Sequence, residues 1–157
     1  MEQAWQTNPG YVLAELSHAA YLPEPEVEAM INQLRGQMQH FDHIGRQAYL
    51  FSWPDLGILV FRGTQSSEYQ DILDDIKVVP VPFRGATVHR GFMEATATLW
   101  AAFDLWRVLK EKASESDDVT MVATGHSLGA AMAVIASMLH PFDALVTFGQ
   151  PLSLIHI

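Results

Sequence analysis

Residues 117–149 read DDVTMVATGHSLGAAMAVIASMLHPFDALVTFG, and this stretch decides the fold. Its first half is an apolar run typical of a buried strand, followed by a small-residue segment of helical length that ends at His140-Pro141. A second apolar run, residues 143–149, predicts another buried strand. Strand, helix and strand in this order imply a parallel crossover, which is right-handed in nearly all proteins. The predicted fold class is therefore α/β.

Between the first strand and the helix lies Gly125-His126-Ser127-Leu128-Gly129, which fits the G-x-S-x-G pattern of a nucleophile elbow. The serine of such an elbow sits in a strained turn, and the flanking glycines let neighbouring backbones approach closely. The helix that follows points its first amide groups at the site, which favours a developing oxyanion. The pattern arises by chance in roughly one chain in twenty of this length. Here a buried strand leads in and a helix leads out, so the sequence predicts Ser127 as a nucleophile.

The remaining elements follow from hydrophobic periodicity and turn residues. We expect helices at 9–21 and 25–38, strands at 48–53 and 57–63, a short helical segment within 65–80, and a long amphipathic helix at about 91–112. Trp53, Trp100 and Trp106 are expected in the core. No repeat or linker is present, so residues 1–151 are predicted to belong to one domain.

Composition argues against several function classes. The formal net charge is −9 with only nine Lys and Arg residues, so no basic stripe for nucleic acid is expected. The longest apolar stretch, 129–139, is shorter than the roughly 20 residues of a transmembrane helix. The spacing of His40 and His43 would allow both on one helix face, but no third ligand is nearby, so a solvated surface is expected there and no metal site. The start, MEQAWQTNPG, has no signal-peptide pattern. The expected location is cytoplasmic by default, with secretion left open.

Five blocks, in this order and spacing, resemble the class 3 (fungal-type) lipase family. They are VFRGTQ (60–65), DILDDIKVVPV (71–81), VHRGFMEA (88–95), TGHSLGAAMA (124–133) and TFGQP (147–151). The resemblance covers about residues 11 to 151. It implies an α/β-hydrolase-type, mostly parallel sheet with flanking helices. It also implies a serine esterase or lipase that acts on acyl-ester or lipid substrates without a metal or organic cofactor.

The resemblance also assigns roles to single residues. Ser127 is the implied acyl-accepting nucleophile, and the oxyanion hole is formed by the backbone N–H of Leu128 together with Thr64. Residues 65–76 occupy the position of the family's lid, a candidate lipid interface, although their acidic composition differs from the usual apolar one. The implied structural residues are Asp75, His89 and, within the elbow, Gly125, His126 and Gly129.

The catalytic acid and base are expected outside residues 1–151. Asp143 and His156 satisfy the order Ser, Asp, His. However, Asp143 would begin a strand parallel to the one before the elbow, which places it roughly 20 Å away at the opposite sheet edge. His156 lies in LSLIHI (152–157), which stands where the family continues with arginine. CTGTCTCTTATACACATC, a sequencing-library adapter, encodes those six residues. We therefore interpret 152–157 as translated adapter and the fold as incomplete at its C-terminus, without its catalytic Asp and His.

Two alternatives remain open from the sequence. A non-catalytic pseudo-hydrolase or binding module would keep the elbow and lack a working triad. A phospholipase, feruloyl esterase or acyltransferase would keep the triad and change the acyl pocket.

The adapter interpretation predicts the DNA sequence across codon 151. Resequencing the source DNA is expected to show an arginine codon after Pro151, with aspartate and histidine codons downstream. A genomic sequence that encodes LSLIHI and then stops would contradict this interpretation and favour the pseudo-hydrolase.

Overall fold

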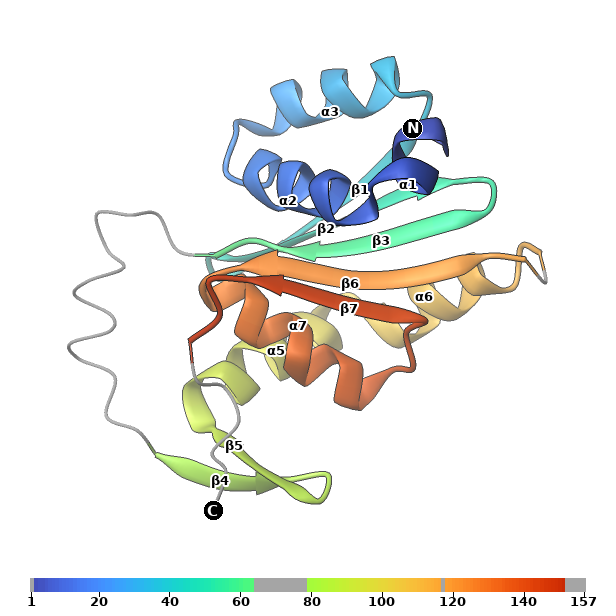
Figure 1. The fold of residues 1–157 in the computed structure, drawn as a ribbon. Helices are drawn as coiled ribbons and strands as arrows, with labels where there is room; N and C mark the ends of the chain where they lie inside the picture. The colour runs from blue at the N-terminus through green and yellow to red at the C-terminus, as the bar shows by residue number, and fades with distance from the viewer. Residues whose placement is uncertain (1, 64–78, 117, 152–157) are drawn as a thin grey trace.

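A five-stranded sheet in the order β1-β2-β3-β6-β7 forms the centre of the protein (Figure 1). The computed structural model describes residues 2–63, 79–116 and 118–151. The strands of the sheet are β1 (Gln37–His43), β2 (Arg46–Trp53), β3 (Leu56–Phe61), β6 (Thr120–His126) and β7 (Ala144–Phe148). β2 pairs antiparallel with both β1 and β3, whereas the β3–β6 and β6–β7 pairs are parallel. All strands of this sheet except β2 therefore point the same way, which confirms the predicted mostly parallel α/β class.

Helices cover both faces of the sheet (Figure 1). One face carries α1 (Glu2–Thr7), α2 (Pro9–Ala19) and α3 (Glu24–Gln33); the other carries α5 (Arg90–Ala102), α6 (Leu105–Ala113) and α7 (Leu128–Leu139). Because successive strand residues point to opposite faces, β3 supplies Leu59 and Phe61 to one core and Ile58 and Val60 to the other. Each of these four side chains is fully buried. The continuous apolar run that predicted β3 thus reflects a strand covered on both sides.

The helix expected over 25–38 ends early, and β1 was not predicted. α3 stops at Gln33 because Arg35 takes a left-handed conformation (φ 56°) and the Gly36 N–H bonds to the Ile31 carbonyl. A Cβ on Gly36 would lie 2.7 Å from the Trp53 indole, so the turn depends on a glycine packed against a residue far away in sequence.

The long helix expected at 91–112 is two helices. Asp104 takes a left-handed conformation (φ 47°) and separates α5 from α6. The rotation this break introduces leaves Trp106 48% exposed, with the Lys110 ammonium 4.8 Å from its ring centroid. The prediction that Trp106 lies in the core was wrong, whereas Trp53 is buried and Trp100 packs against the core.

A two-stranded hairpin lies apart from the main sheet, beside α5 (Figure 1). It consists of β4 (Pro80–Phe83) and β5 (Ala86–His89), joined by Arg84 and Gly85, both at positive φ. Positive φ at both central residues is the signature of a tight hairpin turn. This hairpin was not predicted from the sequence, because its strands are short and two prolines, Pro80 and Pro82, lie within the first.

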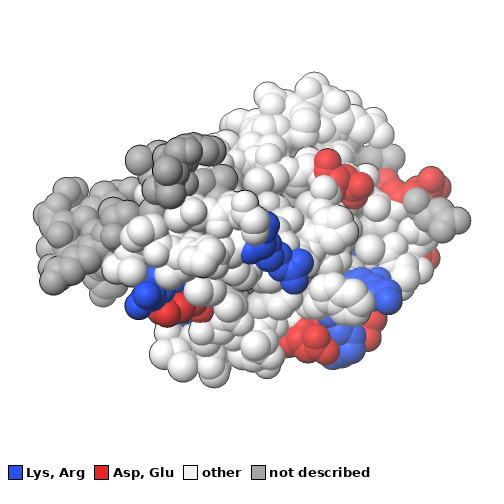
Figure 2. All heavy atoms as spheres, turned by 90° about the horizontal axis from the view of Figure 1, so that it is seen from below, with Lys and Arg blue, Asp and Glu red and all other residues white. Residues whose placement is uncertain are grey.

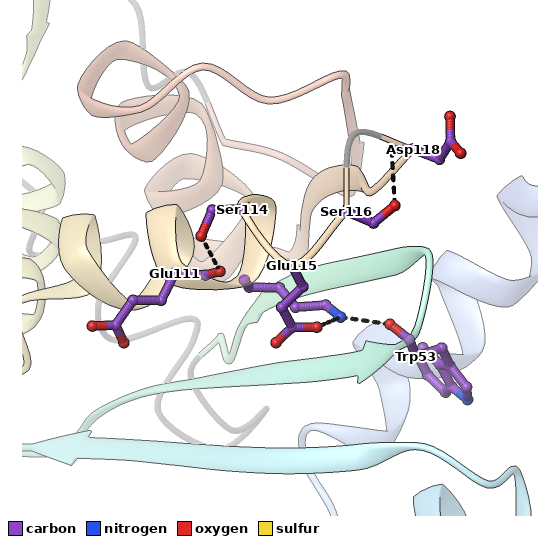
Figure 3. Close-up of polar contacts among 7 residues, drawn as sticks. Trp53, Glu111, Ser114, Glu115, Ser116 and Asp118 are labelled. Atoms are coloured by element: carbon purple, nitrogen blue, oxygen red, sulfur yellow. Dashed lines mark hydrogen bonds and ion pairs between the residues drawn. The ribbon is translucent and has the colours of Figure 1, made fainter.

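The buried ammonium of Lys112 fastens α6 to the end of β2. Its Nζ donates to the Trp53 carbonyl and to Glu115 Oε2, each at 2.6 Å, and the side chain is only 7% exposed. Figure 3 shows the Trp53 carbonyl and the Glu115 carboxylate converging on this amine. The contact joins α6 to β2 at the end of the sheet opposite to Ser127.

Replacing Lys112 with methionine is expected to destabilise the fold by about 1–3 kcal/mol, because the buried Trp53 carbonyl loses its donor. Lys110→Met is the matched control on the same helix, where only an exposed contact with Trp106 is lost, and about 0.5 kcal/mol or less is expected. Urea unfolding of both variants measures the difference. Equal losses in the two variants would contradict a special role for the buried amine.

Candidate active site

Ser127 is the single residue between the end of β6 and the start of α7. Its backbone has φ 58° and ψ −126°, which is outside the regions that L-residues normally adopt. The Ser127 N–H donates to the Phe148 carbonyl at 2.9 Å, and the Ser127 carbonyl accepts from Ala130 N at 3.0 Å. Such a conformation costs on the order of 1–3 kcal/mol and persists only where the surroundings enforce it.

Two glycines make this turn sterically feasible. A Cβ on Gly125 would lie 2.5 Å from the backbone carbon of Gly129, and a Cβ on Gly129 would overlap the carbonyl oxygen of Phe61. The first turn of α7 therefore packs directly on the backbone at the end of β3. The spacing of the G-x-S-x-G motif thus corresponds to two close backbone contacts, one on each side of Ser127.

The hydroxyl of Ser127 lies at the N-terminus of α7. Ser127 is 3% exposed, and its Oγ has no hydrogen-bond partner among the residues that the structure describes. Leu128 is the first residue of the helix, where a backbone N–H has no partner within the helix. The partial positive charge of the N-terminus stabilises negative charge near it. This arrangement suits a nucleophile beside one donor of an oxyanion hole, provided that a base is supplied.

Asp143 is neither the catalytic base nor the carboxylate that would orient a catalytic histidine. Its backbone N–H donates to the Met121 carbonyl at 2.8 Å, and its Oδ2 accepts from Met121 N at 2.7 Å. Met121 lies near the start of β6, whereas Ser127 follows its end, so about 20 Å of strand separates them. The predicted position of Asp143, at the opposite edge of the sheet, is confirmed.

His126 and His89 lie in two of the sequence blocks, and their described contacts are with residues other than Ser127. The ring of His126 is exposed, and its Nδ1 lies 3.0 Å from the hydroxyl oxygen of Tyr21. His89 is buried between β5 and α5, 4.5 Å from Phe92 between ring centroids. Neither ring nitrogen of His89 has a partner in the described part of the chain. The structural roles that the resemblance implies for these two histidines stay predictions.

The other histidines with resolved contacts lie away from the elbow. His40 and His43 lie on β1 and not on a helix face. His40 stacks on Tyr49, and its Nδ1 is 2.9 Å from Glu24 Oε2. His140 lies at the far end of α7, and burial lowers its pKa. No group of three potential metal ligands occurs within residues 2–63, 79–116 and 118–151.

Thr64, Asp75 and the lid segment 65–76 lie outside the described residues, whereas the chain that leads to Thr64 is described. The Arg62 N–H donates to the Gln47 carbonyl at 3.0 Å, and Arg62 Nη1 donates to Gln47 Oε1 at 2.5 Å. A Cβ on Gly63 would lie 2.5 Å from the His126 carbonyl oxygen. The residue before Thr64 is therefore in contact with the elbow.

The surface seen from below carries its Lys and Arg side chains in small, separated groups, some next to acidic residues, and most of that face is uncharged (Figure 2). On that face the described residues form no basic stripe. Within the described ranges, no helix has both the length and the apolar character needed to cross a membrane.

A strained serine between a parallel strand and a helix N-terminus defines an α/β-hydrolase elbow. The sequence profile of the family described as lipase (class 3) matches residues 58–154, more than half of the chain. The protein therefore belongs to the class 3 lipase family, as the five sequence blocks predicted.

Two relatives agree with this assignment, and a solved structure has the same fold. The Saccharomyces cerevisiae protein LIH1 is 32% identical over 118 residues, covering 60% of this chain and 35% of its own length. A lipase of Rhizopus niveus is 37% identical over 82 residues, which is 51% of this chain and 20% of that protein. The crystal structure of a Rhizopus microsporus var. chinensis lipase superposes with a TM-score of 0.68 at 20% identity, covering 90% of this chain and 58% of that one. The chain thus spans about a third or less of these curated relatives.

Gly129→Ala is expected to destabilise the fold by about 1–3 kcal/mol, because the added methyl group meets backbone atoms of Phe61 and Arg62 that cannot rotate away. Gly10→Ala is the matched control, since only Asn8 Oδ1, at 3.8 Å, would be near its Cβ in α2. That substitution is expected to be neutral or stabilising. Urea denaturation midpoints compare the two, and a harmless Gly129→Ala would contradict the close packing of α7 on β3.

Proposed function

We propose that this protein is a serine carboxylic-ester hydrolase, a triacylglycerol-lipase-like enzyme of lipid degradation that works through an acyl-enzyme on Ser127. The observation that carries the proposal is the backbone of Ser127, held at φ 58° between β6 and the N-terminus of α7. Strain of this kind is maintained at functional sites because it presents a side chain in a fixed direction. Membership of the class 3 lipases supports the same chemistry.

The proposed reaction has two steps. Ser127 Oγ attacks the ester carbonyl, a histidine accepts the hydroxyl proton, and the alcohol leaves with that proton. Water then attacks the acyl-enzyme, releasing the carboxylic acid and restoring the serine. In both steps the carbonyl oxygen becomes an oxyanion, which accepts hydrogen bonds from the Leu128 N–H and from the N–H and hydroxyl of Thr64.

We infer that the acid and the base lie outside the described residues. Ser127 Oγ has no partner within the described ranges, Asp143 is at the opposite sheet edge, and the imidazole of His126 is bonded to Tyr21. Residues 1–151 are then the N-terminal part of one lipase-like domain.

The proposed substrate is an acyl ester of the lipid class. This choice follows the relatives, among which the Rhizopus niveus protein is named a lipase. Residues 65–76 precede the β4–β5 hairpin in sequence and are proposed to cover the site at a lipid interface. Phospholipase, feruloyl esterase and acyltransferase specificities use the same elbow and differ in the pocket that holds the acyl and leaving groups.

A fluorophosphonate probe tests the nucleophile in the full-length protein. Labelling is expected on Ser127, identified by peptide mass spectrometry, and is expected to disappear in Ser127→Ala together with hydrolysis of p-nitrophenyl esters. Ser137→Ala is the matched control, because that hydroxyl donates to the Val134 carbonyl within α7 and is not part of the site.

An unlabelled wild-type protein would overturn the hydrolase proposal. The Ser127 hydroxyl, which has no partner among the described residues, would then indicate a pseudo-hydrolase that retains the elbow without an activated nucleophile.

A further inference from the structure

The side chain of Tyr21 lies where three separate chain segments meet. Tyr21 follows the C-terminal end of α2, and its hydroxyl oxygen is 3.0 Å from Nδ1 of His126. The same oxygen is 3.5 Å from the His126 carbonyl oxygen, to which it can donate. The two rings meet edge to face, with centroids 5.9 Å apart. The Tyr21 hydroxyl therefore contacts both the side chain and the main chain of His126, the residue directly before Ser127.

The Tyr21 hydroxyl also contacts the strand end next to the elbow. A Cβ on Gly63 would overlap the hydroxyl oxygen, so glycine lets Tyr21 lie directly against this part of the backbone. The Arg62 guanidinium lies 5.8 Å from the Tyr21 ring centroid and extends this contact along the same segment. The hydroxyl group thus contacts both segments at the point where Gly63 also lies directly against the His126 carbonyl.

These two strand ends carry the two halves of the proposed oxyanion hole. Thr64 directly follows Gly63, and Leu128 is two residues beyond His126. An oxyanion hole requires its donors to be held within about 0.5 Å of their productive positions. The parallel pairing of β3 with β6 aligns the strands only as far as Phe61 and Gly125. Beyond that pair, the described contacts between the two segments include the one made by Tyr21.

We propose that Tyr21 is a positioning residue that fixes the separation of the two oxyanion-hole donors by clamping Gly63 against His126. This inference rests on the proposed function of Ser127. It assigns His126 a second task, because its exposed imidazole is the anchor that holds the tyrosine hydroxyl. Gly149, which leads out of β7, lies on the other side of that imidazole, since a Cβ there would be 3.2 Å from His126 Nε2.

The test is Tyr21→Phe in the full-length protein, a change that removes one oxygen and keeps the ring beside Arg62 and His126. Because a small displacement of catalytic donors costs up to a hundredfold in rate, kcat is expected to fall roughly tenfold to a hundredfold. KM is expected to change by less than about twofold, because the lost stabilisation belongs to the transition state. Tyr11→Phe is the matched control on α2, since Tyr11 is 61% exposed, and its kinetics are expected to be unchanged.

A double-mutant cycle shows whether Tyr21 acts through His126. In a His126→Phe background, Tyr21→Phe is expected to have no further effect on kcat, because the anchor is already absent. The ¹⁵N chemical shift of His126 Nδ1 provides a readout independent of activity and is expected to move in Tyr21→Phe. Additive effects on kcat, or an unchanged Nδ1 shift, would overturn the proposal.

The fluorophosphonate reaction of the same variants separates the two proposals. If wild-type Ser127 reacts and Tyr21→Phe reacts at the same rate, the positioning role is wrong and the hydrolase proposal stands. If wild-type Ser127 does not react, the hydrolase proposal fails, and the assignment of Tyr21 to an oxyanion hole fails with it. Slower labelling of Tyr21→Phe, with unchanged Tyr11→Phe, supports both.

Discussion

The close contact of α7 with the backbone of β3 is the constraint on which the rest of the site depends. Gly129 lies so near the Phe61 carbonyl that no larger residue fits, and a Cβ on Gly125 would likewise overlap the backbone of Gly129. With the helix start held there, the chain has only one residue, Ser127, in which to turn from strand to helix. Its positive φ is therefore a consequence of packing on both sides. Parallel pairing of β3 with β6 then brings the chain that leads to Thr64 beside the elbow.

The two ends of the parallel strands differ in their contacts. At the C-terminal ends, where Ser127 lies, backbone segments approach closely and Ser127 Oγ is buried without a partner among the described residues. At the opposite strand ends, the Lys112 ammonium donates to the Trp53 carbonyl, and Asp143 both donates to and accepts from the backbone of Met121. These contacts hold the strands at one end, while the strained residue Ser127 lies at the other end. This division is the usual one in parallel α/β sheets, which place their sites at the C-terminal ends of the strands.

The parts of the fold that the sequence predicted are those encoded by neighbouring residues. β3, β6, α7 and β7 follow from continuous apolar runs and from the glycine spacing around Ser127. A missed part can depend on residues far apart in the chain: α3 ends at Gln33, and Gly36 in the turn that follows packs on Trp53. Helical periodicity across residues 25–38 gave no sign of this turn. The break at Asp104 is a left-handed residue that no local motif signals. The role inferred for Tyr21 was equally invisible, since the residue follows a helix and has no motif of its own.

A crystal structure of the full-length protein, inhibited by diethyl p-nitrophenyl phosphate, tests the central claim most directly. That reagent loses p-nitrophenolate as its phosphorus bonds to the serine, and the diethyl phosphoryl adduct mimics the tetrahedral intermediate. Our account predicts phosphorus bonded to Ser127 Oγ, with the phosphoryl oxygen about 2.7–3.1 Å from the backbone nitrogens of Leu128 and Thr64. It also predicts the Tyr21 hydroxyl still bonded to His126 in that complex. An adduct on another residue, or a phosphoryl oxygen turned away from Leu128, would contradict the account.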